Sequence, residues 1–441
     1  MRPLFVFDLG PEARPEDLRP LNAPLPEGAL LYLSGFALET LPEHLAEVLA
    51  EQAAKGRIEL LGGGLFSPYL PLLPERDAAW QLSDMAELIE ERLGVEVEGA
   101  YLADGAFDLR LVPILAEEGY TYALLPKAAL KAPAHVEVED RSIRLFPFAK
   151  GQVDDRPPDP NAPYPAAYIE GADHPRMLPR QSARAKDLYA KMRWVSDKLE
   201  EAHRAPEPAY QRLYRGQWGP AYRGQDPAAA WAHRQLIAAE NLSDPRKYAW
   251  VEASVEDIDG DGYPEAVLES HVMAAFLRPA EGGRLVALDL RDPELPVLAA
   301  RSLGLSYHAR DPERLRPVFD QTQFEASRYR ERVHLLARGR LGTTPVEVKK
   351  TYKLRAKARR LELELRVQNL GRRPVSGHFA LDFWPRPEPR LAETGVRVGP
   401  LTIQAPGARV VARDGGLFFV YALELAPERA RRFSLVFEED A

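Results

Sequence analysis

The first 125 residues alternate short apolar runs with longer amphipathic stretches. Nearly continuous apolar runs, as in strands of a parallel sheet buried on both faces, occur at residues 4–9, 29–35, 58–64, 99–105 and 122–125. Between these runs, residues 42–54 and 78–93 have helical character, and Gly94 follows the second stretch. This β-α-β-α order predicts an α/β domain with a parallel sheet or barrel.

The pattern changes twice further along the chain. Residues 150–180 are rich in proline, glycine and aspartate, which predicts a linker or long loop. Amphipathic helices are expected at residues 187–201 and 228–242. From about Tyr248 the apolar positions repeat every second residue, which indicates antiparallel strands. The clearest alternation buries four positions, Leu361, Leu363, Leu365 and Val367.

These patterns predict an α/β plus all-β protein with three regions. Residues 1–160 are expected to form a truncated or distorted, incomplete β/α barrel domain. Residues 161–245 are expected to form a linker and helical region, and residues 246–441 an antiparallel β-sandwich domain. The length of 441 residues agrees with this division, because it exceeds what one ordinary core holds.

Composition and charge narrow the classes of function. The net charge is -8 and basic residues are scattered, so no nucleic-acid partner is expected. No apolar run approaches the ~20 residues of a membrane span, and Asp8 interrupts the N-terminal run, so a cytoplasmic location without membrane contact is expected. The absence of cysteine excludes disulfides and thiol nucleophiles. The 40 prolines and many charged residues favour a thermophilic source.

Residues 257–265, with the sequence DIDGDGYPE, place three carboxylates at alternate positions before a glycine, as a calcium-binding loop does. The predicted calcium ligands are the side chains of Asp257, Asp259, Asp261 and Glu265 and the carbonyl of Tyr263. The flanking segments have strand character, which excludes an EF-hand and predicts a structural role for any ion. A solvated acidic hairpin without metal is the alternative, because Asp-Gly pairs are strong turn formers.

Several segments in the first half resemble family 57 of the glycoside hydrolases, especially its 4-α-glucanotransferases and related α-amylases. Residues 62–82, GGGLFSPYLPLLPERDAAWQL, are similar to a conserved region of that family. Residues 99–125, beginning GAYLADGAFDLRL, are similar to the strand end that carries its nucleophile. RLFPF at 144–148 and KDLYAKMRWVSDKLEEA at 186–202 resemble later segments in the same order.

The resemblance continues into the second half. Residues 255–289 are similar to the start of the family's C-terminal domain, and HFALDFW at 378–384 to a later strand of it. The family resemblance implies a distorted β/α barrel, a helical region and a sandwich of the type seen in sugar mutarotases. It also implies retaining chemistry on α-1,4-glucans, which needs two carboxyl groups about 5 Å apart.

Most of the catalytic positions implied by the resemblance have changed. Asp104 stands where the family has its nucleophilic Glu, and Ser67 where it has a second Glu. After the first strand, Asp8-Leu-Gly-Pro replaces a His motif. The general-acid motif has no counterpart because the segment at 148–186 is too short, and the last barrel motif keeps mainly Trp218.

Three hypotheses follow. The first is a pseudoenzyme with a vestigial Asp104, which binds an α-glucan or maltooligosaccharide through Tyr101, Phe107 and Trp218. The second is a weakly active retaining hydrolase or transferase that uses Asp104 with an unidentified acid. The third is a scaffold or interaction protein without a sugar ligand, in which Asp104 only hydrogen-bonds a loop and the rings are core. A shortened barrel that exposes an apolar flank would also favour a homo-oligomer.

Overall fold

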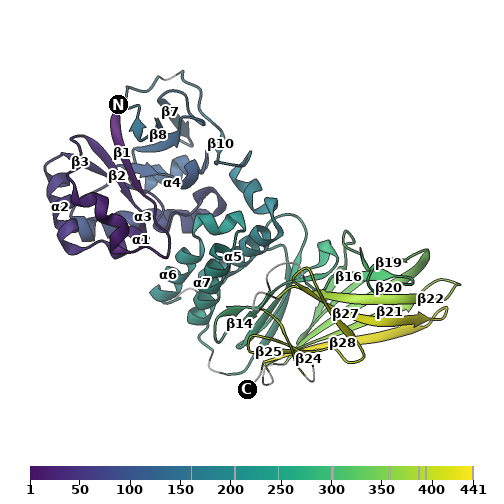
Figure 1. The fold of residues 1–441 in the computed structure, drawn as a ribbon. Coiled ribbons are helices and arrows are strands. Elements are labelled where there is room, and N and C mark those ends of the chain that lie inside the picture. The colour runs from purple at the N-terminus through teal and green to yellow at the C-terminus, as the bar shows by residue number, and fades with distance from the viewer. Residues whose placement is uncertain are drawn as a thin grey trace. The chain divides into compact units, whose positions relative to one another are not determined.

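The computed structural model divides the chain into two compact units, Met1–Leu236 and Ile237–Ala441, here called the first and second unit (Figure 1). The boundary falls within helix α7, Ala228–Ser243. The structure describes residues 1–159, 161–202, 205–246, 248–298, 302–355, 357, 359–385, 388–392 and 395–439.

The first unit contains a sheet of eight strands that closes on itself. Six strands run parallel to one another: β1 (Arg2–Phe7), β2 (Ala29–Leu33), β3 (Ile58–Gly62), β4 (Gly99–Tyr101), β6 (Tyr122–Pro126) and β8 (Arg141–Ala149). The short β9 (Gln152–Val153) pairs antiparallel with both β1 and β8 and completes the ring. Strand β7 (Ala134–Val138) extends the sheet from β8. The five predicted parallel strands are confirmed, whereas closure through the two-residue β9 was not predicted.

In the sequence, the helices of the first unit come between these strands and after the last of them. They are α1 (Gly35–Thr40), α2 (Glu43–Ala54), α3 (Glu75–Leu93), α4 (Leu111–Glu117), α5 (Ala183–Glu201) and α6 (Glu207–Gly216), followed by α7, which continues into the second unit. Helices α2 and α3 pack against each other and against β3 (Figure 1). Gly94 ends α3 in the left-handed conformation, with φ of 68°, as its position predicted.

The segment predicted as a linker at 150–180 is partly regular. It contains β9, β10 (Ala167–Tyr168) and the 3₁₀ helix η4 (Pro175–Gln181). Strand β10 forms because it pairs with β5 (Phe107–Asp108), far away in the sequence. Further 3₁₀ turns are η1 (Pro15–Asn22), η2 (Leu70–Leu72), η3 (Ala103–Gly105) and η5 (Gly219–Arg223).

The described residues of the second unit form three antiparallel sheets around an apolar core. The first sheet holds β11 (Val251–Glu256), β12 (Glu265–Ser270), β13 (Met273–Arg278), β14 (Arg284–Leu290) and β15 (Leu295–Pro296), with η6 (Pro279–Glu281) between β13 and β14. The second holds β16 (Leu305–His308), β17 (Arg316–Val318), β22 (Val375–Phe383), β26 (Arg409–Arg413) and β27 (Gly416–Leu425).

The third sheet of this unit has eight strands. They are β18 (Glu325–Tyr329), β19 (Arg332–Leu341), β20 (Thr344–Arg355), β21 (Arg360–Asn369), β23 (Arg390–Ala392), β24 (Gly395–Val398), β25 (Leu401–Gln404) and β28 (Ala430–Glu439). The predicted alternation is confirmed in β21, where Leu361, Leu363, Leu365 and Val367 are all buried in the core. No helix in the described part of the chain is long and apolar enough to cross a membrane.

Candidate functional site

Three polar residues follow parallel strands of the first unit at the carboxyl end of the sheet. Asp8 follows β1, Ser67 comes shortly after β3, and Asp104 comes shortly after β4. The Ser67 hydroxyl donates a short hydrogen bond to Oδ1 of Asp8, and the Tyr32 hydroxyl lies 3.0 Å from the same Ser67 oxygen. Loops at this end of a barrel commonly carry function, so these residues define the candidate site.

The carboxylate of Asp104 is held by two neighbouring side chains. Its Oδ2 accepts a short hydrogen bond from the Tyr69 hydroxyl. The Arg223 guanidinium donates to the same oxygen from Nη2 at 2.6 Å and from Nε at 3.2 Å. Arg223 also reaches the carbonyl of Glu170 at 3.0 Å. We call this arrangement of Tyr69, Arg223 and Asp104 the Asp104 clamp.

Two residues of the site have left-handed backbone conformations that are uncommon outside glycine. Asp104 has φ of 49° and Ser67 has φ of 50°. Such conformations cost free energy and persist only where surrounding contacts impose them. At Asp104 the carbonyl accepts a hydrogen bond from the Glu170 amide at 3.1 Å, and this contact fixes the turn. These backbone conformations place the side chains of Ser67 and Asp104 at the carboxyl end of the sheet.

Asp8 is the second carboxyl group of the site. Its pKa is raised from 3.8 to about 6, mainly by burial and also by the charge of Asp104, while the hydrogen bond from Ser67 acts in the opposite direction. The protonated form of Asp8 is therefore available at mildly acidic pH, whereas the clamp keeps a cation against Asp104.

The aromatic residues predicted to contact sugar differ in accessibility. The Tyr101 ring lies 4.5 Å from that of Tyr32 and is partly exposed. Trp218 is also partly exposed and lies against Gly10, where an added Cβ would come within 2.7 Å of the indole. Trp218 joins the site through Gly219, whose amide donates to the Ser67 carbonyl at 3.1 Å. Phe107 is 0% exposed and offers no accessible face, so we leave it out of the proposed sugar-binding surface.

Sequence reasoning missed the contributions of Tyr69, Arg223 and Tyr32 to this site. The position of Asp8 directly after a buried strand was a usable signal, because carboxyl ends of parallel strands converge. Arg223 lies more than a hundred residues from Asp104 in a 3₁₀ turn, and no local pattern marks it.

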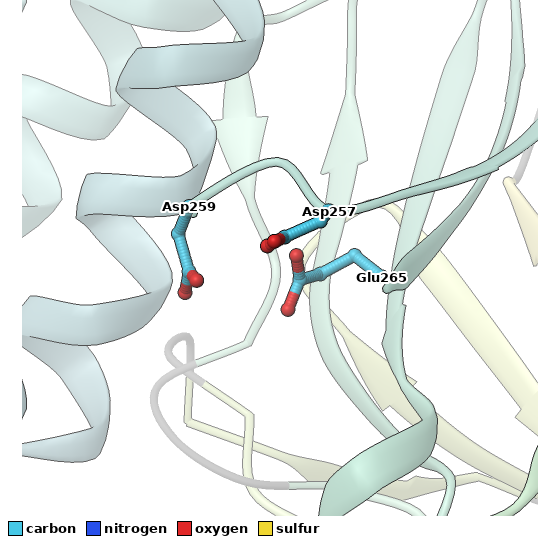
Figure 2. Close-up of side chains that lie close together, drawn as sticks. All are labelled: Asp257, Asp259 and Glu265. Carbon is cyan, nitrogen blue, oxygen red and sulfur yellow. The ribbon is translucent and has the colours of Figure 1, made fainter. Parts of the chain in front are cut away.

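The acidic loop forms a second group of carboxylates, within the second unit. Residues 257–264 connect β11 to β12 as a hairpin, so the predicted strand flanks are confirmed. One carboxylate oxygen from each of Asp257, Asp259 and Glu265 lies within 4.8 Å of the others. Figure 2 shows these three side chains turned toward one another. Their spacing fits oxygen ligands around Ca²⁺, which bind at about 2.3–2.6 Å.

The carboxylate of Asp261 is not part of this group of three, and ligation by the Tyr263 carbonyl stays a prediction. Asp257 also accepts hydrogen bonds from the amides of Asp261 and Gly262, at 3.0 and 2.9 Å, and Asp261 accepts one from the Tyr263 amide. The guanidinium of buried Arg278 lies 3.6 Å from Asp259 and 3.4 Å from Glu265. Burial and then the charge of Asp259 raise the pKa of Glu265 to about 7, although the charge of Arg278 acts to lower it.

The chain is similar in sequence to known glycosyl hydrolases. Residues 16–215 match the family model described as Glycosyl hydrolase family 57. An alpha-amylase 1 of Dictyoglomus thermophilum is 32% identical over 102 residues, which are 22% of this chain and 15% of that protein. A 4-alpha-glucanotransferase of Thermococcus kodakarensis is 27% identical over 132 residues, or 27% of this chain and 20% of that protein. These matches thus span no more than a fifth of the relatives' length.

A solved structure supports the same relationship at the level of the fold. The crystal structure of 4-alpha-glucanotransferase from Thermococcus litoralis aligns with a TM-score of 0.69 and covers 93% of each chain, at 14% sequence identity. That identity is evidence for the fold alone. Together with the match of the family model, it confirms the resemblance of this chain to glycosyl hydrolase family 57, with the family-model match lying over residues 16–215.

Proposed function

We propose that the protein is an α-glucan-binding relative of family 57 that does not cleave its ligand. The observation that carries this proposal is the Asp104 clamp, in which one carboxylate oxygen accepts three hydrogen bonds from Tyr69 and Arg223. All three bonds go to Oδ2, so attack on a sugar through this oxygen would require Tyr69 and Arg223 to release it first. The clamp therefore favours binding over covalent catalysis.

Two further arguments point the same way. The Asp104 side chain is one methylene shorter than Glu, and a displacement on the order of 1 Å can cost about a hundredfold in rate. Loss of a general acid typically costs a further ~10²–10⁴. The resemblance to the family supplies the ligand class, and the resemblance of the second half implies a sandwich of the sugar mutarotase type.

The second candidate is weak hydrolase or transferase activity, and Asp8 favours it. This buried carboxyl has a pKa of about 6 and lies within electrostatic reach of Asp104. A carboxyl that exchanges its proton near neutral pH is suited to general acid catalysis. In this alternative Asp8 would supply the acid and Asp104 would leave Arg223 when substrate enters.

Calorimetry with maltooligosaccharides tests the proposed binding. We expect saturable heat with maltohexaose, and at least a tenfold weaker association for Trp218→Leu, because its partly exposed indole would lose the sugar face. Trp194→Leu is the matched control, since this partly exposed indole belongs to α5 and stacks with Lys198. Absence of heat at millimolar sugar would contradict glucan binding and favour the scaffold hypothesis.

We also propose that the Asp257–Asp259–Glu265 group holds a structural Ca²⁺. The ion would be bound by these carboxylates and would stabilise the β11–β12 hairpin. We expect millimolar Ca²⁺ to raise the melting temperature relative to EDTA, and Asp257→Asn to remove at least half of the rise. Glu256→Gln is the control, because it removes a neighbouring exposed charge from β11. A melting temperature that is equal in Ca²⁺ and in EDTA would contradict the proposal. The ion pairs of Arg278 with Asp259 and Glu265 would then stabilise the hairpin without a metal ion.

A further inference from the structure

Helices α3 and α6 enclose an aromatic pocket that lies outside the strand-end site. The pocket has a volume of about 260 Å³ and is lined by Trp80, Asp84, Glu207, Tyr210 and Tyr214. Trp80 and Asp84 are four residues apart on α3, and the α6 residues follow a helical spacing of three and four. Each helix therefore presents one face to the pocket.

Neighbouring rings of the pocket lie close to one another, Trp80 with Tyr210 at a steep angle and Tyr210 with Tyr214 at 39°. Trp80 and Tyr210 meet edge to face at 5.2 Å with an interplanar angle of 86°, and Tyr210 and Tyr214 lie 6.4 Å apart. The faces of aromatic rings carry partial negative charge, and several rings around one space attract alkylammonium groups. Trp80 already has the guanidinium of Arg76 5.4 Å from its ring centroid, with Asp77 and Glu200 pairing that arginine.

Carboxylates line the same pocket without a basic partner of their own. The ion pairs found across the described ranges include none with Asp84 or Glu207, which line the pocket, and none with Glu87 of the neighbouring hollow. Burial and then the charges of Glu207 and Glu87 raise the pKa of Asp84 from 3.8 to about 6. Burial and then the charge of Asp84 raise the pKa of the Tyr214 hydroxyl, which agrees with a carboxylate close to that ring.

The pocket opens onto an acidic hollow along α3. This hollow has a volume of about 320 Å³ and shares Asp84 and Glu207 with the aromatic pocket, while Glu87 and Glu91 continue the line. Positions 84, 87 and 91 lie on one helix face over about 10 Å. Like charges at this spacing destabilise a helix, and a bound cation would remove that cost. Glu39 also lines the hollow, but it is paired with Arg215 and adds no free charge.

We propose that this α3–α6 groove is a binding site for a linear polyamine. One terminal ammonium lies among Trp80, Tyr210 and Tyr214, with Asp84 and Glu207 as its counter-ions. The remaining nitrogens extend along Glu87 and Glu91. A neutral sugar would use the rings but leave the row of carboxylates uncompensated, so the charges favour the polycation.

Titration calorimetry with spermidine at physiological ionic strength tests this site. We expect one site per chain, and at least tenfold weaker binding for Asp84→Asn, Glu207→Gln and Trp80→Leu. Glu90→Gln is the matched control, because it removes the same charge from an exposed position of α3 outside the pocket. Asp84→Asn is nearly isosteric, and an unchanged melting temperature would show that the fold is intact.

Two outcomes would overturn the proposal. The first is that spermidine shows no saturable binding at millimolar concentration. This includes the case in which maltotriose binds instead and Trp80→Leu weakens that binding. The second is equal weakening by Glu90→Gln and Asp84→Asn, which would show general attraction to an acidic surface. Neither outcome bears on Asp104, so this test is separate from that of the proposed function.

Discussion

Replacing Lys350 with Met is expected to destabilise the second unit by about 3–5 kcal/mol. Lys350 lies at an inward-facing position of β20 and is 0% exposed. Its Nζ donates to the carbonyls of Gly282, Gly283 and Leu303, at 3.1, 2.7 and 2.8 Å. Methionine fills a similar volume but leaves these carbonyl oxygens buried without that donor. Chemical denaturation followed by circular dichroism measures the loss.

Lys353→Met provides the control for this variant. Lys353 belongs to the same strand, but its ammonium pairs at 3.0 Å with Glu331, whose side chain is 42% exposed. Ion pairs near the surface contribute about 0–1 kcal/mol, so this substitution should have a small effect. Equal losses for the two variants would show that the three carbonyl contacts of Lys350 carry no special weight.

The charge of Lys350 should also make stability depend on pH. Burial, and then the charge of Arg284, lower its pKa from 10.5 to about 7. Between these values the unfolded chain binds a proton that the folded protein does not, so this group makes stability rise with pH across that window. The rise should be smaller in Lys350→Met, and an identical pH profile would show that Lys350 titrates normally.

Gly63→Ala is expected to destabilise the first unit by about 3 kcal/mol or more. Gly63 has φ of 144°, which L-residues rarely adopt, and an added Cβ would lie 2.4 Å from the carbonyl oxygen of Tyr101. That oxygen belongs to the end of β4, so relief of the clash requires movement of the sheet where Asp104 is positioned. Denaturation experiments should show the loss, and calorimetry should show weaker maltohexaose binding.

Gly56→Ala separates the clash from the backbone conformation. Gly56 has φ of 66°, and its added Cβ would meet no atom within 4 Å. This variant carries only the cost of the left-handed conformation, about 1 kcal/mol. If Gly63→Ala lowered the free energy of unfolding no more than Gly56→Ala, the contact between Gly63 and the Tyr101 carbonyl would be less restrictive than the structure indicates.

The fold was predictable where local pattern and packing agree. Continuous apolar runs identified β1, β2, β3 and β6, and alternation identified β21, because burial on one or two faces leaves a period in the sequence. Closure of the barrel through β9 could not be predicted in this way, because a strand of two residues is too short to produce a periodic pattern of apolar residues. Lys350 is a charged residue at an inward-facing position of β20, where the alternation predicts an apolar one. The reason is its hydrogen bonds to three carbonyl groups that are distant in the sequence.

The candidate site was predictable only in part. Asp104, Tyr101 and Trp218 came from the resemblance to the family, whereas Asp8 was not predicted as a site residue. The partner that changes the chemistry of Asp104 is Arg223, which the fold brings from a distant turn. All five predicted calcium ligands were assigned from loop spacing, and the carboxylate of Asp261 does not join the Asp257–Asp259–Glu265 group. Spacing cannot show that a buried Arg278 lies beside the carboxylates.

Product analysis of amylose digests tests the central claim most directly. The wild-type protein and Asp104→Asn are incubated at pH 5, where Asp8 with a pKa of about 6 is mostly protonated and catalysis by the second candidate would be most favourable. If the Asp104 clamp belongs to a binding site without catalysis, both proteins release the same background of reducing ends. Release by the wild type that exceeds Asp104→Asn by tenfold or more would contradict this account and establish Asp104 as a catalytic residue.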